Sequence, residues 1–113
     1  MSQNETPHGD LNAANWWRPD IFEERADHLV LRADMVKHLR EFFDRNGYVE
    51  VETPALQTSP GMEPHLSVFE TCLTGPRGND LPIHLHTSPE FAMKKLLAAG
   101  MQRIFQLAHV YRN

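Results

Sequence analysis

The sequence lacks most of the features that mark secreted, membrane-spanning or nucleic-acid-binding proteins. A single cysteine, Cys72, rules out an internal disulfide framework and fits a reducing compartment. No apolar run approaches the roughly 20 residues that a membrane-spanning helix needs, and the start Ser2-Gln3-Asn4-Glu5 has no basic or apolar signal region. The formal net charge of −4 provides no basic footprint for nucleic acid. We therefore expect a cytoplasmic protein.

The composition is that of an ordinary soluble globular chain. Of its 113 residues, 41% are hydrophobic and 23% are charged, which argues against a disordered chain. Residues 1 to about 15 are rich in Asn, Gly, Pro, Ser and acids, and we interpret residues 1–28 as a largely flexible N-terminal tail. Trp16 and Trp17 are expected to dock this tail onto the folded part of the chain.

Hydrophobic periodicity predicts a long helix over residues 29–45. Asn46-Gly47 follows, and glycine supplies the left-handed backbone that commonly ends a helix. One face of the predicted helix carries apolar residues spaced by three or four positions: Leu31, Met35, Leu39 and Phe42.

A second helix is predicted to start at Pro89. The Ser88 hydroxyl can accept a hydrogen bond from a free N–H of the first turn, and Pro89 fits the first helical position, where no donor is needed. Gly100 can supply the residue that ends this helix. Glu90 then lies in the first turn. By itself, a carboxylate there can simply complement the helix dipole.

The remaining segments read as strands and turns. Residues 48–52 alternate apolar and acidic side chains like a strand, and residues 56–64 carry loop chemistry. Residues 66–71 and 83–86 are predicted to be two strands joined by a turn over residues 75–80. The expected order is therefore helix, strand, hairpin, helix and a final strand.

Seven histidines raise the possibility of a metal site. Most of a cupin metal motif is matched by Gly78, His84, His86 and Glu90. His84 and His86 could bind one metal ion together, because alternate residues of a strand point the same way. Two features oppose this interpretation. Leu97 stands where the motif needs a glycine, and the residues after Glu90 favour a helix where a cupin needs a strand. The alternative is two histidines on one strand face.

Several stretches in the same order resemble the class II aminoacyl-tRNA synthetases. Residues 32–54 are similar to motif 1 of that class, and residues 103–107 with Tyr111-Arg112-Asn113 look like the strand that enters motif 2. Four stretches look like the lysyl-tRNA synthetase branch: His65-Leu66, Phe69-Glu70-Thr71, Thr87-Ser88-Pro89-Glu90 and Met93-Lys94-Lys95-Leu96-Leu97. The resemblance covers about residues 29–113.

The resemblance implies an α+β fold. Residues 29–113 would form the N-terminal part of a class II catalytic domain, an antiparallel sheet flanked by helices, truncated within motif 2. Usual lysyl-tRNA synthetases carry an anticodon-binding OB-fold domain of the order of 100 residues ahead of motif 1, whereas about 28 residues precede it here. The chain thus resembles more closely the stand-alone ligases that modify elongation factor P. A fragment of a lysine–tRNA ligase and an inactive remnant are the alternatives.

The resemblance also implies a reaction and its residues. ATP and a lysine-type amino acid, lysine or (R)-β-lysine, would give an aminoacyl-adenylate, and the acyl group would pass to a lysine of elongation factor P or, in the alternative, to tRNA-Lys. Ser88, Pro89 and Glu90 would bind the amino acid. Arg112 would be catalytic and bind ATP, because a guanidinium matches phosphate geometry, and Asn113 would line the nucleotide site. The ligands of Mg²⁺ are expected beyond the chain end.

Two expectations concern the whole protein. Motif 1 usually builds a dimer interface, so a full-length version is expected to form a homodimer. Five residues are accordingly interpreted as core or interface: Val36, Leu39, Phe43, Tyr48 and Pro54. The fragment alone is expected to be inactive and to fold poorly, because strands that should be central would be left as edges.

Overall fold

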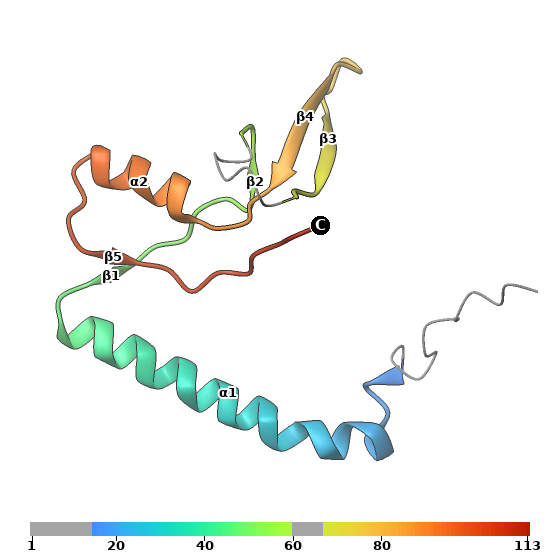
Figure 1. Cartoon of the computed structure of the whole chain (residues 1–113), viewed down its shortest axis with the longest axis vertical. Helices are drawn as coiled ribbons and strands as arrows, with labels where there is room; N and C mark the ends of the chain where they lie inside the picture. The colour runs from blue at the N-terminus through green and yellow to red at the C-terminus, as the bar shows by residue number, and fades with distance from the viewer. Residues whose placement is uncertain (1–14, 60–66) are drawn as a thin grey trace, which may run out of the picture. The chain divides into compact units, whose positions relative to one another are not determined.

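The computed structural model describes residues 15–59 and 67–113. The chain divides into two compact units, one ending at Phe42 and the other running from Phe43 to Asn113. Helix α1 (Pro19–Arg45) is the main element of the first unit, and its last turn already belongs to the second (Figure 1). The part of the predicted tail before residue 15 lies outside the described residues.

The long helix starts earlier than its apolar periodicity indicates. The prediction of a start near residue 29 was wrong, because α1 begins at Pro19 and residues 19–28 are helical rather than part of a tail. Proline fits the first helical position, and Arg18 pairs with Asp20 in the first turn at 3.0 Å. Charged side chains dominate residues 20–28, so a search for an apolar stripe misses this segment. The assignment of residues 29–113 to one incomplete domain stays a prediction.

Both helices end at the predicted glycines. Gly47 has a φ of 76° and Gly100 a φ of 116°, values that favour glycine. After α1, the N–H of Tyr48 donates to the carbonyl of Phe43 at 3.0 Å. After α2 (Glu90–Ala98), the N–H of Met101 donates likewise to Leu96 at 3.1 Å. These bonds pair carbonyls that a helix end leaves open.

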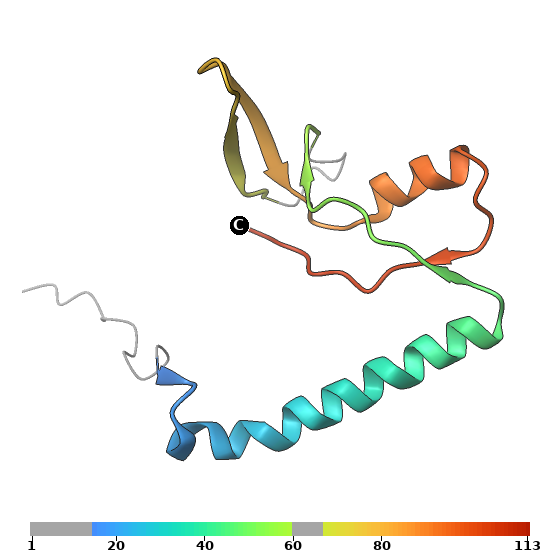
Figure 2. The same cartoon turned by 180° about the vertical axis from the view of Figure 1, so that it is seen from behind.

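A two-stranded parallel ladder follows α1. Strand β1 (Val49–Glu50) pairs with β5 (Ile104–Phe105), as the two opposite views in Figures 1 and 2 show. Both predicted strands are present but shorter than expected. The Phe43 ring stacks on the Phe105 ring with centroids 4.3 Å apart, and Phe105 is one of the buried apolar residues of this unit. The end of α1 is thereby packed onto the ladder.

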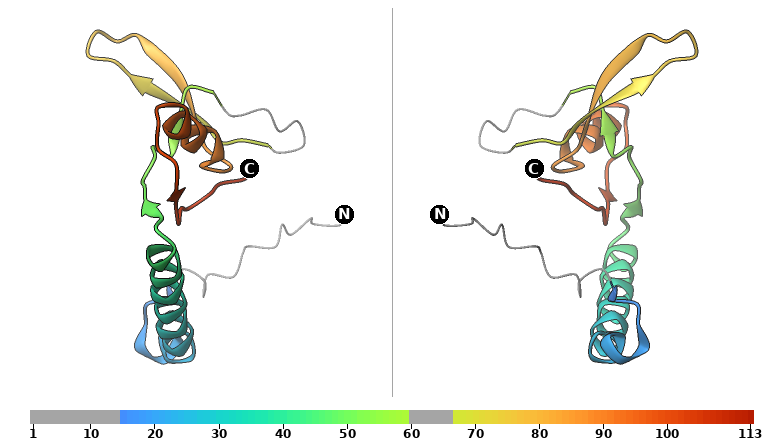
Figure 3. Two further views of the ribbon diagram at one scale, coloured as in Figure 1. Left: turned by 90° about the vertical axis from the view of Figure 1, so that its left-hand side faces the viewer. Right: turned by 90° about the vertical axis from the view of Figure 1, so that its right-hand side faces the viewer.

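The second sheet is antiparallel, in the order β2–β4–β3. The predicted hairpin is confirmed as β3 (Glu70–Thr74) and β4 (Asp80–Leu85), with bounds shifted by a few residues (Figure 3). Strand β2 (Leu56–Gln57) lies in the predicted loop and was missed, because two residues give no periodicity and their partner, β4, is distant in sequence. The rest of that loop, from residue 60, and Leu66 lie outside the described residues.

The architecture confirms the α+β class, with one correction. The predicted antiparallel sheet holds for β2–β4–β3, but the β1–β5 ladder is parallel. The local sequence could not predict the parallel pairing of β1 with β5, because it joins residues more than fifty positions apart. In the part of the chain that the structure describes, no helix combines the length and the apolar character needed to cross a membrane.

Candidate functional site

The turn between β4 and α2 carries the three predicted substrate-binding residues. His86 and Thr87, which follow β4 directly, are 4% and 8% exposed, and the chain then emerges at Ser88. The Ser88 hydroxyl accepts the expected hydrogen bond from the N–H of Glu90 at 3.1 Å, but the prediction of Ser88 as the N-cap was wrong, because Pro89 is the N-cap of α2. The helix is one residue shorter than expected, because it begins at Glu90 and not at Pro89. Pro89 has helical φ and ψ, and its carbonyl accepts the first helical bond, from the N–H of Met93.

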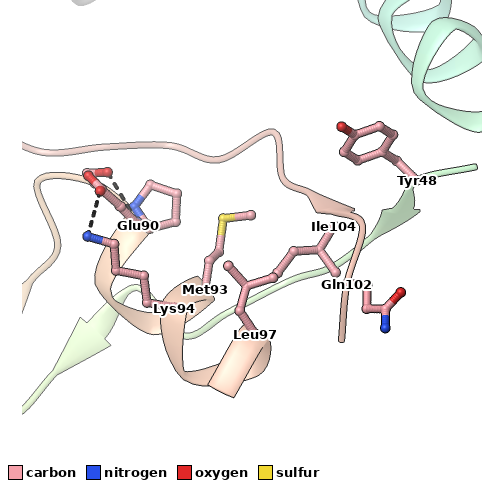
Figure 4. A pocket seen from close by; sticks show the side chains of 9 residues that line it. Tyr48, Glu90, Met93, Lys94, Leu97, Gln102 and Ile104 are labelled. Atoms are coloured by element: carbon pink, nitrogen blue, oxygen red, sulfur yellow. Dashed lines mark hydrogen bonds and ion pairs between the residues drawn. The ribbon is translucent and has the colours of Figure 1, made fainter. Parts of the chain in front are cut away.

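These residues open into a pocket of about 450 Å³ in the second unit (Figure 4). The pocket combines residues of the turn, one face of α2 and the start of the β1–β5 ladder. Its lining is Tyr48, Ser88, Pro89, Glu90, Met93, Lys94, Leu97, Gln102 and Ile104. Ser88, Pro89 and Glu90, predicted from one short sequence pattern, thus line a single concave site.

The pocket is polar at its ends and apolar between them. At one end, Lys94 Nζ lies 3.0 Å from Glu90 Oε1, and Figure 4 shows Tyr48 and Gln102 at the other. Three aliphatic or thioether side chains form the wall between the ends: Met93, Leu97 and Ile104. This arrangement suits an elongated molecule with an aliphatic middle and a cationic group, because an ammonium leaving water needs a carboxylate partner.

Six of the nine pocket residues were not predicted from the sequence to bind a ligand, and three of these are polar: Tyr48, Lys94 and Gln102. Lys94 lies one helical turn after Glu90, so the i, i+4 spacing was an available signal. Tyr48 was interpreted as core or interface. Its ring makes an edge contact with Phe43 at 5.4 Å, and it also lines the pocket. Gln102 gave no local signal, because the β1–β5 ladder brings its segment beside Tyr48.

Arg112 and Asn113 do not line this pocket. Both are exposed, and the N–H of Asn113 donates to the carbonyl of Ser67 at 3.1 Å. The segment that carries them is nevertheless hydrogen-bonded to the residues just before the turn. The N–H of Tyr111 donates to the carbonyl of His86 at 3.2 Å, two residues before Ser88. A backbone hydrogen bond therefore links the segment before Arg112 to the segment before Ser88, and the roles of Arg112 and Asn113 stay predictions.

Comparison with known proteins supports the resemblance in these motifs. Residues 18–113 match the family model of the class II tRNA synthetases (D, K and N), a range that includes every residue of the pocket and both Arg112 and Asn113. The chain belongs to this family.

Curated relatives of this class II synthetase chain include proteins named "Elongation factor P--(R)-beta-lysine ligase". The protein of Hamiltonella defensa is 41% identical over 102 residues, or 89% of this chain and 30% of the relative. The protein of Sodalis glossinidius is 45% identical over 86 residues, or 75% and 26%. That of Haemophilus influenzae strain PittGG is 42% identical over 104 residues, or 91% and 31%. The chain spans less than a third of these relatives.

The cupin hypothesis is wrong for this class II synthetase chain. Glu90 belongs to a helix, where a cupin needs a strand. His84 Nε2 lies 3.6 Å from a carboxylate oxygen of Glu70, and His86 Nε2 bonds to the carbonyl of His109. Among residues 15–59 and 67–113, no three His, Cys, Asp or Glu side chains form a group that could hold a metal ion.

Proposed function

We propose that this chain supplies the amino-acid-binding turn of a ligase that activates a lysine-type amino acid with ATP and transfers it to a lysine of elongation factor P. The observation that carries the proposal is the pocket itself. Ser88, Pro89 and Glu90 border a space with an aliphatic wall, in a chain at least 41% identical to curated proteins named for this activity.

The amino acid would lie along the pocket with an ammonium group at Glu90. The Glu90 side chain is 63% exposed and already holds the Lys94 ammonium at 3.0 Å, so its carboxylate is accessible to a cation. The methylene groups of a lysine-type chain would contact the apolar wall, which removes apolar area from water. The Ser88 hydroxyl lies beside Glu90 and can bond to the same ligand.

Arg112 is proposed to act on ATP. The substrate carboxylate would attack the α-phosphate, forming an acyl–phosphate bond as pyrophosphate leaves. An exposed guanidinium can donate two parallel N–H bonds to phosphate oxygens and stabilise the charge that develops there. Asn113 would line the same nucleotide site. The family implies Mg²⁺, but no Mg²⁺ ligands are assigned, since the described residues contain no group suited to a metal ion.

The second step would move the acyl group to an amine. The ε-amino group of a lysine on elongation factor P would attack the acyl carbon, forming an amide and releasing AMP. The alternative acceptor is the terminal ribose hydroxyl of tRNA-Lys, which would form an ester. The names of the relatives favour the protein acceptor.

The proposal is tested on the full-length product of the gene that encodes this chain. We expect exchange of pyrophosphate into ATP that depends on lysine or (R)-β-lysine, followed by transfer of labelled amino acid to elongation factor P. Glu90→Gln should raise KM for the amino acid by about 10- to 100-fold, because a hydrogen bond to a charged group is lost. Arg112→Lys should lower kcat by about 100-fold, because the paired donors are lost.

Glu70→Gln serves as the matched control. Glu70 is also a glutamate beside a cation-forming side chain, His84, but it lies on β3 and does not line the pocket. This variant should keep both kinetic constants within about twofold. Transfer to tRNA-Lys and not to elongation factor P would select the alternative acceptor. Absence of amino-acid-dependent exchange in the wild-type protein would refute the proposal.

A further inference from the structure

Among the described residues of the second unit, His86 is the most buried polar residue, at 4% exposure. Its Nε2 is 2.6 Å from the carbonyl oxygen of His109. A carbonyl only accepts, so the imidazole must carry its proton on Nε2 and donate to His109. The side chain of a residue that follows β4 directly is thereby bonded to the main chain of the segment that carries Arg112.

The main chain of His86 makes a second link to the same segment. Its carbonyl accepts the N–H of Tyr111 at 3.2 Å, and the Tyr111 ring lies against the imidazole with centroids 6.1 Å apart. Residues 109 and 111 are therefore both attached to residue 86, one through the ring and one through the backbone. Arg112 follows directly in the chain.

Packing alone does not account for an imidazole at this position. The Nδ1 atom of His86 is buried and has no hydrogen-bond partner among the residues that the structure describes. An unpaired buried polar atom opposes folding, and an apolar side chain of similar volume would avoid that cost. What the imidazole adds is the Nε2 hydrogen bond to His109.

We infer that His86 is a positioning residue that holds the Arg112 segment in register with the Ser88–Glu90 turn. The inference rests on the proposed function, in which Glu90 binds the amino acid and Arg112 acts at the α-phosphate. The two groups must be held in one geometry, because small displacements of reacting groups lower the rate steeply. His86 supplies that constraint from a position outside the pocket lining.

Two variants and a matched control test this role. His86→Leu keeps an apolar side chain of similar size but removes the donor. His86→Gln places an amide N–H the same number of bonds from Cβ as Nε2 and should restore the bond. His109→Ala is the control, since the acceptor is the main-chain oxygen of residue 109 and survives truncation of its side chain.

The first readout is amide hydrogen exchange in the full-length gene product, and it does not depend on catalysis. His86→Leu should accelerate exchange at Tyr111 by about tenfold, as expected when one local hydrogen bond is lost. Exchange in the β3–β4 hairpin should stay unchanged. His86→Gln and His109→Ala should match the wild type at both places. Uniform acceleration in the hairpin and at Tyr111 would indicate a structural role only and would overturn the inference.

The second readout is pyrophosphate exchange by the full-length gene product, normalised to active sites. His86→Leu should lower kcat by about 10- to 100-fold and change KM for the amino acid by less than about threefold, with recovery in His86→Gln. A wild-type protein without exchange activity refutes the proposed function but leaves the hydrogen-exchange result standing. Unchanged kcat in His86→Leu, with an active wild type, refutes the positioning role.

Discussion

At the scale of single residues, Glu90 already has a cationic partner before any substrate binds. Lys94 Nζ lies 3.0 Å from its carboxylate, and both side chains are about two-thirds exposed, at 66% and 63%. Such an exposed i, i+4 pair contributes only about 0.3–0.5 kcal/mol. An incoming ammonium group can therefore replace Lys94, but the two cations compete for one carboxylate.

This competition predicts that Lys94→Met tightens binding of a lysine-type substrate. Methionine keeps the helix-forming, unbranched side chain but removes the positive charge from the pocket. KM for the amino acid should fall by about twofold, which corresponds to the roughly 0.3–0.5 kcal/mol of an exposed i, i+4 ion pair. The measurement is the dependence of pyrophosphate exchange on amino acid concentration in the full-length gene product.

Lys95→Met is the matched control for this change. Lys95 is the next residue of α2, but its Nζ lies 5.3 Å from the centre of the Phe91 ring and the residue does not line the pocket. Its substitution should leave KM unchanged. A rise in KM on Lys94→Met would contradict the prediction and would assign Lys94 to the carboxylate or phosphate of a substrate.

At the scale of elements, α1 presents apolar side chains to solvent. Leu31, Met35 and Leu39 follow one another at intervals of four residues, which places them on one face, and they are 57%, 58% and 44% exposed. In the second unit, by contrast, Phe43 packs on Phe105. Five residues were interpreted as core or interface: residues 36, 39, 43, 48 and 54. They lie in different environments, since Leu39 is exposed on α1 and Phe43 is packed against Phe105.

We predict that the full-length protein forms a homodimer through this face of α1, as proposed for motif 1. Met35→Glu should raise the dimer dissociation constant by at least about tenfold, because an unpaired carboxylate would be buried in the interface. Val30→Glu introduces the same charge on another face of α1, where residue 30 is 69% exposed, and should leave the dimer intact. Light scattering that finds only monomer at micromolar concentration in the wild type would refute the prediction.

At the scale of the whole molecule, the apolar core of the described residues is small. Only Ile83 and Phe105 are buried hydrophobic residues there, at 7% and 8% exposure. The cost of ordering a chain amounts to about 1–2 kcal/mol for each backbone residue and must be offset by buried apolar area. Two buried side chains with their half-buried neighbours fall short of this requirement.

We therefore predict that the isolated 113-residue chain lacks a cooperative thermal unfolding transition. Near-ultraviolet circular dichroism should change gradually with temperature, since few aromatic rings have a fixed environment. The same measurement on the full-length gene product should give a sigmoidal curve. A single sharp transition in the isolated chain, coincident in the near- and far-ultraviolet, would show that it folds independently.

Local chemistry by itself determined the glycines at which both helices end, the hairpin and the turn that carries Ser88. A glycine with positive φ or a serine before a proline acts through bonds to its own neighbours, so Gly47, Gly100 and Ser88 were readable in sequence. The family was readable too, because its motifs keep their order along the chain. Pro19 suits a first helical position, but the charged side chains in the first turns of α1 provide no apolar stripe that would reveal them in the sequence.

Only the tertiary structure decided which residues distant in sequence lie side by side. Parallel pairing of β1 with β5 brings Tyr48 and Gln102 to the pocket, and His86 ties the segment of Arg112 to the turn at Ser88. Strand pairing and buried hydrogen bonds join residues separated by tens of positions, and no local propensity encodes which partner is chosen. The sequence therefore determined the separate parts of the site, and long-range hydrogen bonding determined how they meet.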